Sequence, residues 1–328
     1  ILEARNAELV ALTARTPERA EQLRRKHGAK RAYTSEEELL RDPEVDAVYI
    51  ATPVAEHYRE GTLATQAGKH ILMEKPLTVS ADETKALIDC CEAHKVAFGA
   101  GFMMRFGTHV QSMRRAVLDG RIGTVLSGTA NFTLWMPYQS GVWRLQKKNG
   151  GGALMDMGIH CLDLISFITG MRVTEVAAMN ENVLFRDPGY EVEDSSAVLL
   201  RMENGAQFFV QSSFNIPYAE AKWHLNLFGS KGRLMGDNIL GQEDTGTLNL
   251  IDADMLPTLD PRPQTGYGQG RMCPAVFGNL YTREIESFSE SVLCGTPLEV
   301  PATQALEVQR VVDAAYRSSR EKRIISLL

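Results

Sequence analysis

Three side chains of this 328-residue chain could together take a proton from a substrate hydroxyl. His160 suits the role of base, because an imidazole titrates near neutral pH. Asp156 precedes it by four residues, so on a helix the two side chains share one face and the carboxylate can orient the imidazole and stabilise its charged form. Lys75 follows a predicted strand, where its ammonium could hold the hydroxyl in place. The pattern predicts a relay that removes a hydroxyl proton while a hydride leaves the same carbon.

Structural roles for the same residues stay open at this point. A lysine at a strand end is usually a surface residue, and an Asp-x3-His pair is often only an exposed helical salt bridge worth a few tenths of a kcal/mol. Asp156, His160 and Asp163 could also be imagined as metal ligands. No further ligand cluster with suitable spacing accompanies them, so we expect no metal.

The elements that must position Lys75 alternate between strand and helix. Apolar runs at 7–13, 45–51, 71–73 and 96–101 are typical of strands, and 17–27 and 55–66 of helices. Ser35 with Glu38, and Ser80 with Glu83, form capping boxes for two more helices, the second ending near Ala93. This alternation predicts right-handed crossovers and a parallel sheet of the Rossmann type, with ligands beyond the carboxyl ends of the strands.

Asp156 and His160 lie in a second half with a different pattern. After a helix at 108–119, β-rich segments follow at 124–134, 196–202, 207–215 and 223–228, and Asn204-Gly205 predicts a hairpin. Residues 246–270 are typical of an irregular excursion, and helices are predicted at 283–294 and 303–318. The expected fold is α/β followed by α+β: a dinucleotide-binding domain over 1–120 and an open, mainly antiparallel sheet domain over 121–328. The last helix could pack back on the first domain.

The end of the first predicted strand is where a Rossmann-like fold grips an adenosine ribose. It reads Ala14-Arg15-Thr16, with no neighbouring carboxylate for a free 2′-hydroxyl. Guanidinium binds phosphate in a bidentate way, so Arg15 favours NADP over NAD, although a solvated surface arginine is the alternative.

A G-x-G-x-x-G loop is absent before this strand. Gly99-Ala100-Gly101 does not supply one, because Met104 stands where the third glycine should be. We expect about twenty-five residues of a βαβ opening to precede residue 1.

Two segments resemble the signature of the glucose-fructose oxidoreductase, inositol dehydrogenase and MocA family (Gfo/Idh/MocA). The first is Ala51-Thr52-Pro53 with His57, followed by Glu74-Lys75-Pro76, and the second is the glycine-rich stretch 151–163, which contains Asp156, His160 and Asp163. The resemblance spans nearly the whole chain, and the order and separation of these motifs make the combination specific.

The resemblance implies roles for the matching residues. Lys75, Asp156 and His160 match the family's catalytic group, and the segments around Thr52, His57 and Glu74 match its cofactor side. Arg105, together with Trp143-Arg144, resembles family positions near cofactor or substrate, where an arginine could bind substrate hydroxyls or a carboxylate; an interdomain salt bridge is the alternative. The residues expected to bind cofactor are Ala14, Arg15, Thr16, Ala51, Thr52, Pro53, His57, Glu74, Lys75 and Arg105, and those expected to bind substrate are Lys75, Arg144, Asp156 and His160.

Composition argues against several classes of partner. A net charge of −6 gives no basic stripe for a phosphate backbone, so we expect no nucleic-acid partner. No run of about eighteen apolar residues is present and residues 1–20 carry charges throughout, so we expect no membrane partner and a cytoplasmic location. Five cysteines, an odd number without a C-x-x-C pair, are expected to be buried free thiols, with Cys90 and Cys91 on different faces of a helix.

The main hypothesis is an NAD(P)-dependent oxidoreductase that acts on a secondary alcohol or carbonyl of a sugar, cyclitol or related polyol. Two alternatives of the same fold are a dinucleotide-binding sensor without turnover and an NAD-dependent glycoside hydrolase. Retention of Lys75, Asp156 and His160 argues against the sensor. Family resemblance further implies a homodimer or homotetramer.

Overall fold

The computed structural model describes residues 1–217, 223–252 and 270–328, which form two compact units. The first unit comprises Ile1–Phe102 and Tyr281–Glu307, and the second comprises Met103–Leu280 and Val308–Leu328. The sequence placed the division at residue 120. In the division into compact units, the helix after Met103 belongs to the second unit, and the C-terminal segment Tyr281–Glu307 belongs to the first.

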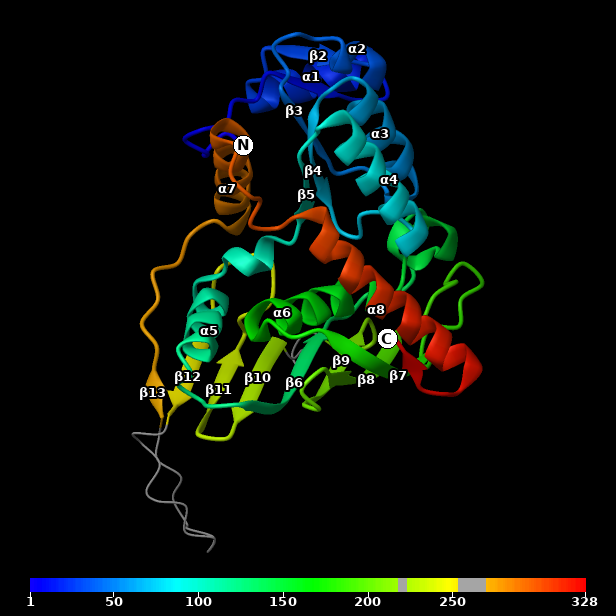
Figure 1. Ribbon diagram of the computed structural model, residues 1–328. Helices are drawn as coiled ribbons and strands as arrows, with labels where there is room; N and C mark the ends of the chain where they lie inside the picture. Colours follow the sequence, from blue (N-terminus) through cyan, green and yellow to red (C-terminus); the bar gives the residue numbers. More distant parts are fainter. Residues whose placement is uncertain (218–222, 253–269) are drawn as a thin grey trace, which may run out of the picture. The chain divides into compact units, whose positions relative to one another are not determined.

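The first unit contains parallel strands connected by helices (Figure 1). One parallel pair joins β1 (Ala11–Thr13) to β2 (Arg31–Tyr33), and a second parallel sheet has the order β3 (Ala47–Ile50), β4 (His70–Glu74), β5 (Phe98–Gly101). The helices are α1 (Pro17–His27), α2 (Glu36–Leu40), α3 (Val54–Gln66), α4 (Ala81–His94) and, from Tyr281 onward, α7 (Leu280–Cys294). Most of these bounds agree with the predicted alternation to within a few residues, but β2 was not predicted, and β1 begins at Ala11 although a strand was expected from residue 7.

Local capping explains where the helices of the first unit begin. Thr16, Ser35 and Ser80 each accept a hydrogen bond from a backbone N–H three residues ahead, at the start of α1, α2 and α4. Gly28 ends α1 with a left-handed φ of 68°. The two predicted capping serines are thus confirmed.

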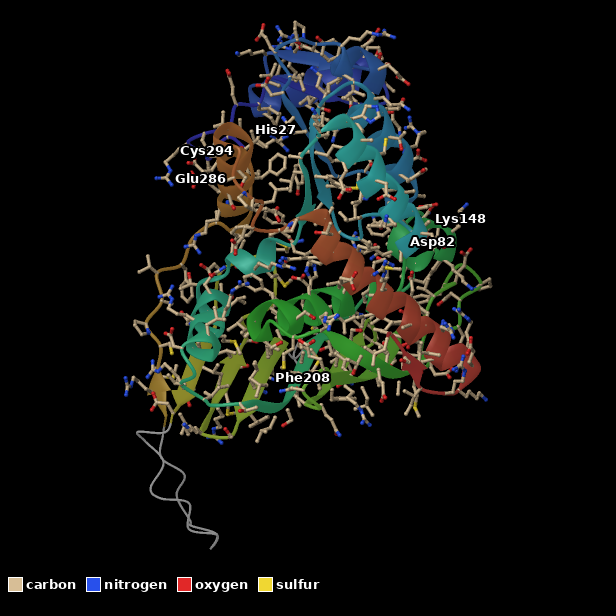
Figure 2. The ribbon with its side chains drawn as sticks, in the orientation of Figure 1. His27, Asp82, Lys148, Phe208, Glu286 and Cys294 are labelled. Carbon is tan, nitrogen blue, oxygen red and sulfur yellow. The ribbon has the colours of Figure 1, made fainter. Side chains whose placement is uncertain are left out.

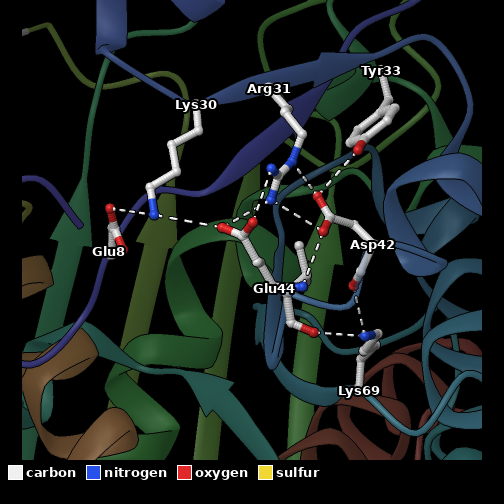
Figure 3. Close-up of polar contacts among 8 residues, drawn as sticks. Glu8, Lys30, Arg31, Tyr33, Asp42, Glu44 and Lys69 are labelled. Atoms are coloured by element: carbon white, nitrogen blue, oxygen red, sulfur yellow. Dashed lines mark hydrogen bonds and ion pairs between the residues drawn. The ribbon is translucent and has the colours of Figure 1, made fainter.

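An ion-pair network lies at the amino ends of these strands (Figure 3). Arg31, the first residue of β2, donates to Asp42 at 2.6 Å, and Lys69, just before β4, donates to two carbonyl oxygens that precede β3. The other members are Glu8, Lys30, Tyr33 and Glu44. This network joins the starts of the strands, at the edge opposite the carboxyl ends where ligands are expected.

The second unit is built on a nine-stranded mixed sheet with the order β13-β12-β11-β10-β6-β9-β8-β7-β14. Its strands are β6 (Val125–Thr133), β7 (Val173–Glu181), β8 (Ser195–Met202), β9 (Gln207–Ser213), β10 (Trp223–Gly229), β11 (Gly232–Asp237), β12 (Thr247–Ile251), β13 (Arg271–Met272) and β14 (Ile325–Ser326). Among the described strands of this sheet, β6 and β9 pair in parallel and the other pairs are antiparallel. The predicted open, mainly antiparallel sheet is confirmed.

Helices cover one face of this sheet. Figure 1 shows α5 (Thr108–Leu118) and α6 (Ile159–Thr169) lying along it. Phe208 of β9, labelled in Figure 2, is 1% exposed beneath this layer. The long helix α8 (Ala302–Glu321) runs from the first unit into the second.

Several predictions for the second half need correction. Strands β7 and β11 were not predicted, and residues 247–251 form β12 inside the segment expected to be irregular. The rest of that segment falls largely on 253–269, outside the described residues. The hairpin at Asn204-Gly205 is confirmed, since β8 and β9 pair in antiparallel register around it.

The cysteines are free, as predicted, but only Cys91 and Cys161 are buried. Cys294, at the end of α7 (Figure 2), is exposed, and Cys90 and Cys273 are partly exposed, so the prediction of buried thiols was wrong for these three. Cys90, beside buried Cys91, is partly exposed, which confirms that the two lie on different faces of α4.

One helical stretch, Lys147–Thr169, is long and apolar enough by composition to cross a membrane. Its apolar window is 94% buried, and the core helix of a compact unit passes the same test, so this is weak evidence for a membrane span.

Candidate active site

The end of β4 places Glu74 and Lys75 at the carboxyl edge of the parallel sheet. The Glu74 carboxylate accepts a hydrogen bond from the Tyr49 hydroxyl at 2.5 Å and another from the Lys75 backbone N–H at 3.2 Å. The peptide bond between Lys75 and Pro76 is cis. Burial, followed by the charge of Glu74, raises the pKa of Tyr49, so the tyrosine stays a neutral donor. Tyr49 therefore fixes the carboxylate next to Lys75, a role that the sequence did not indicate.

His57 joins the loop after β3 to the loop after β4. Its ring lies with Nε2 at 2.8 Å from the Thr52 carbonyl oxygen and Nδ1 at 3.1 Å from the Pro76 carbonyl oxygen. The side chain is 1% exposed, and burial lowers its pKa, against the opposing effect of these carbonyl groups. His57 thus holds the two loops together from inside the unit.

Thr52, in the loop after β3, donates its hydroxyl proton to Glu60 of α3 at 2.5 Å. Glu60 is 8% exposed, and burial raises its pKa to about 7. Ala51 and Pro53 flank Thr52, and Pro53 is the N-cap residue that precedes α3. Sequence reasoning missed Glu60, because nothing local marks a buried glutamate among the charges of a surface helix.

The end of β1 presents one cation. Ala14 continues the sheet by donating its N–H to Tyr33, and Thr16 caps α1. Between them Arg15 is exposed, and in the part of the chain that the structure describes it has no hydrogen-bond or ion-pair partner. Of these three residues, Arg15 is the one with a side chain available to an anion.

In the second unit, Asp156 and His160 lie on one continuous helical segment. Leu154–Gly158 has π-helical geometry, which occurs frequently at functional sites, and α6 follows from Ile159. Asp156 is 7% exposed and accepts a hydrogen bond at 3.0 Å from Nε of Arg144. His160 is 3% exposed, and its ring lies 6.2 Å, centroid to centroid, from the ring of Phe132.

Arg144 therefore contacts Asp156, a member of the predicted catalytic group. In the sequence, the glycine turn 150–152 separates Arg144 from Asp156. Its guanidinium also lies over the Trp143 ring, 4.5 Å from the centroid, and its side chain is 38% exposed. The sequence predicted Arg144 near the substrate but did not pair it with Asp156. The expected geometry for Asp156 and His160 was that of an α-helix, and the π-helical turn at Asp156 corrects that detail.

Arg105 forms a buried ion pair. It is 2% exposed, and Nε and Nη2 donate to Asp163, which is 1% exposed. Its guanidinium also lies 4.8 Å from the ring centroid of Phe167. Both residues of this ion pair belong to the second compact unit, and the contact of Arg105 with cofactor or substrate stays a prediction.

The Asp163 carboxylate is thus bound by the Arg105 guanidinium. Burial raises its pKa, and the neighbouring guanidinium opposes that shift. Within residues 1–217, 223–252 and 270–328, no group of three or more His, Cys, Asp or Glu is arranged to hold a metal ion.

The predicted site residues thus fall into two sets. Ala14, Arg15, Thr16, Ala51, Thr52, Pro53, His57, Glu74 and Lys75 belong to the first unit, and Arg105, Arg144, Asp156 and His160 to the second. Hydrogen bonds link members within each set: His57 to Thr52, and Arg144 to Asp156.

Comparison with known proteins gives two family matches that cover most of the chain. Residues 1–102 match the model described as "Oxidoreductase family, NAD-binding Rossmann fold", and residues 110–235 match "GFO/IDH/MocA C-terminal domain".

Relatives match over almost the full length. The chain is 31% identical to 1,5-anhydro-D-fructose reductase of Ensifer adhaerens, over 89% of this chain and 82% of the relative. It is 30% identical to D-xylose 1-dehydrogenase (NADP(+)) 2 of Haloferax volcanii, over 99% and 94%. Among solved structures, the aldose-aldose oxidoreductase of Caulobacter crescentus, complexed with glycerol, superposes with a TM-score of 0.86 at 25% identity, covering 99% of this chain and 93% of that one.

Proposed function

This chain belongs to the Gfo/Idh/MocA family of oxidoreductases, and from that membership we propose that it transfers a hydride between NAD(P) and a secondary alcohol or carbonyl group. The substrate class that we propose is a sugar, cyclitol or related polyol, because the relatives include a reductase of an anhydro sugar and a dehydrogenase of xylose. The observation that carries the proposal is the hydrogen bond from Arg144 to the buried carboxylate of Asp156, which lies on the helical segment of His160. The same chain presents Lys75 after a parallel strand.

The residues of the first unit fit a dinucleotide. The carboxyl edge of its parallel sheet offers a hydroxyl at Thr52 and an ammonium at Lys75, on loops that His57 and Tyr49 hold in place. A Cβ atom at Gly101 would lie 3.0 Å from Cα of Glu74, so the neighbouring strand ends pack closely at this edge. When bound, the nicotinamide would supply the hydride acceptor or donor for the substrate carbon.

The chain's own residues would handle the proton and the substrate. In the oxidation direction, the substrate hydroxyl proton passes to the His160 imidazole. Asp156, held by Arg144, stabilises the imidazolium that results, and the Lys75 ammonium orients the reacting oxygen. Because both residues of the Arg144–Asp156 pair are fixed before substrate arrives, little reorganisation is needed at the moment of transfer.

The direct test uses purified protein with a broad panel of sugars and polyols, monitored at the absorbance band of reduced nicotinamide. We expect Lys75→Ala to lower turnover strongly while the affinity for cofactor stays nearly intact. Lys85→Ala is the matched control, since Lys85 forms an exposed pair with Asp89 on α4. Absence of NAD(P) binding, or of any turnover across the panel, would contradict the proposal. Release of sugar from a chromogenic glycoside without net reduction of cofactor would favour the hydrolase alternative.

We further propose that NADP is preferred over NAD. Arg15 supports this preference, because it follows β1 with an exposed guanidinium that can bind a 2′-phosphate. Thermal stabilisation by NADP should exceed that by NAD at equal concentration, and Arg15→Ala should remove the difference. Arg25→Ala, at the other end of α1, serves as control. If Arg15→Ala were still stabilised more by NADP than by NAD, to the same extent as the wild type, Arg15 would not be the cause of the preference.

Location and assembly complete the proposal: a cytoplasmic homodimer or homotetramer with small-molecule partners. The negative net charge supports the absence of a nucleic-acid partner. Exposed apolar residues on adjacent strands of the large sheet, Leu199 and Phe209, support self-association.

A further inference from the structure

Glu193, two residues before β8, contacts the start of the helical segment that carries Asp156 and His160. One carboxyl oxygen, Oε1, accepts a hydrogen bond from the Leu154 backbone N–H at 2.9 Å. The Glu193 carbonyl oxygen accepts another from the Ala153 N–H at 3.3 Å. The first N–H groups of a helix have no partner inside the helix, so a side chain that bonds them fixes where the helix begins.

The carboxyl group of Glu193 is itself held from other directions. The Tyr316 hydroxyl of α8 donates to Oε1 at 2.9 Å. At Gly152 a Cβ atom would lie 2.5 and 2.7 Å from the two carboxyl oxygens and 2.7 Å from the Tyr316 hydroxyl. The glycine also has a φ of +125°, which L side chains rarely adopt. The Glu193 carboxyl group therefore packs directly against Gly152. It occupies the space that a side chain at residue 152 would need.

The turn held in this way is the one from which Asp156 projects. The Asp156 N–H donates to the Gly152 carbonyl oxygen at 2.9 Å, and the π-helical stretch starts at Leu154. The position of Leu154 thus sets the rotation of the residues that follow it. A displacement of about 1 Å at a reacting group can cost on the order of a hundredfold in rate.

We propose that Glu193 is a positioning residue for the reaction: its carboxyl oxygen fixes the first turn of the helix, so that Asp156 and His160 present their side chains at the correct place. The inference rests on the proposed function for its effect on turnover. It concerns contacts within the second unit alone, so it can also be tested without substrate or cofactor.

The hydrogen-bond acceptor, not the charge, performs this role. Burial raises the pKa of Glu193 to about 7, although the bonds from Leu154 and Tyr316 oppose that shift. Near neutral pH the group is therefore a mixture of acid and carboxylate, and both forms keep an oxygen that can accept from Leu154. A glutamine offers the same acceptor at the same reach, whereas aspartate keeps the charge but is one methylene too short.

The experiment compares four variants with the wild type: Glu193→Ala, Glu193→Asp, Glu193→Gln and the control Glu203→Gln. Glu203 is a matched control, because its carboxylate also accepts from one backbone N–H and one side chain, both of Arg172. Two quantities are measured: kcat and KM with a substrate found for the wild type, and the NMR titration of the His160 imidazole in protein without cofactor.

We expect Glu193→Ala and Glu193→Asp to lower kcat by roughly 10- to 100-fold with little change in KM, and to shift the His160 titration. Glu193→Gln should keep kcat within a few-fold of the wild type, and Glu203→Gln should match it. If Glu193→Ala does not fold, Glu193→Asp carries the test.

Wild-type kcat and an unshifted His160 titration in Glu193→Asp would overturn the inference, as would a Glu193→Gln variant as impaired as Glu193→Asp. A wild type without turnover on any substrate would count against the proposed function alone. The His160 titration would then still decide whether Glu193 positions the helix.

Discussion

At the scale of single residues, some carboxyl groups are buried although the charge pattern of the sequence suggests that they are exposed. Glu60 lies on a helix whose sequence is largely polar, yet it is 8% exposed and holds the Thr52 hydroxyl. Its pKa is raised to about 7, chiefly by burial. Between the usual glutamate pKa and this value, the folded protein keeps a proton that the unfolded chain releases, so Glu60 lowers stability as pH rises through that window.

Glu60→Gln removes this titration. The free energy of unfolding of the variant, relative to the wild type, should therefore rise between pH 5 and pH 8, by about 1 to 3 kcal/mol. Urea unfolding at several pH values measures the difference. Glu56→Gln, exposed on the same helix, should follow the wild type at every pH. A difference between Glu60→Gln and the wild type that does not vary with pH would contradict the raised pKa.

The buried pair of Arg105 and Asp163 leads to a second residue-scale prediction. Removing one partner leaves the other charge buried, so Arg105→Ala should cost about 3 to 5 kcal/mol of stability. Arg105→Met combined with Asp163→Leu should cost less, because no charge is stranded. Arg317→Ala, which breaks an exposed pair with Glu321, should cost at most about 1 kcal/mol. If the double variant were as unstable as Arg105→Ala, stranding of a charge would not be the cause.

At the scale of elements, the glycine turn before the π-helical stretch is more constrained than an ordinary positive-φ turn. Gly152 and Gly120 both have positive φ, at 125° and 68°. A Cβ atom at Gly120 would meet nothing within 4 Å, whereas one at Gly152 would collide with Glu193 and Tyr316. Substitutions at Gly120 and Gly152 therefore distinguish the cost of backbone strain alone from the cost of strain together with a steric clash.

Gly120→Ala should cost about 1 to 2 kcal/mol, from backbone strain alone. Gly152→Ala should cost more, and it should also lower kcat, because the turn that carries Asp156 must move. Urea unfolding and steady-state kinetics of both variants provide the comparison. Equal losses of stability, with activity intact in both, would show that the contact with Glu193 does not constrain the turn.

The large sheet shows why some elements were missed. β7 mixes Val173, Thr174 and Val176 with alanines, glutamates and an asparagine, and β11 contains two glycines, so the local preference for a strand is weak in both. Both are strands because neighbours on each side supply backbone hydrogen bonds. Pairing partners distant in sequence can override a weak local preference.

At the scale of the whole molecule, the sheet of the second unit exposes apolar side chains in adjacent strands. Leu199 of β8 is 56% exposed and lies directly opposite Phe209 of β9, which is 36% exposed. Met179 of β7, the strand next to β8, is 75% exposed. Exposed apolar side chains on adjacent strands commonly mark a protein interface.

We expect the chain to form a homodimer or homotetramer through this surface. Leu199→Glu should therefore reduce the assembly to a smaller species in light scattering coupled to size-exclusion chromatography. Leu118→Glu, at an exposed site on α5, should leave the assembly unchanged. A wild type that is monomeric at micromolar concentration would refute the prediction.

The sequence by itself determined the features that depend on nearby residues. Thr16, Ser35 and Ser80 start helices because each caps an N–H only three residues away, and strand–helix alternation fixed the parallel sheet and the place of Lys75 at a strand end. The spacing of Asp156 and His160 likewise placed both on one helical segment.

Tertiary structure alone decided the partners of those residues. Tyr49 reaches Glu74, Arg105 reaches Asp163, and Tyr316 reaches Glu193 across 25, 58 and 123 positions of sequence. Such contacts depend on how whole elements pack, and no local spacing encodes them. For the same reason, the glutamates that bind Thr52 and the first turn of the His160 helix could not be distinguished from surface charges until the fold brought them to these partners.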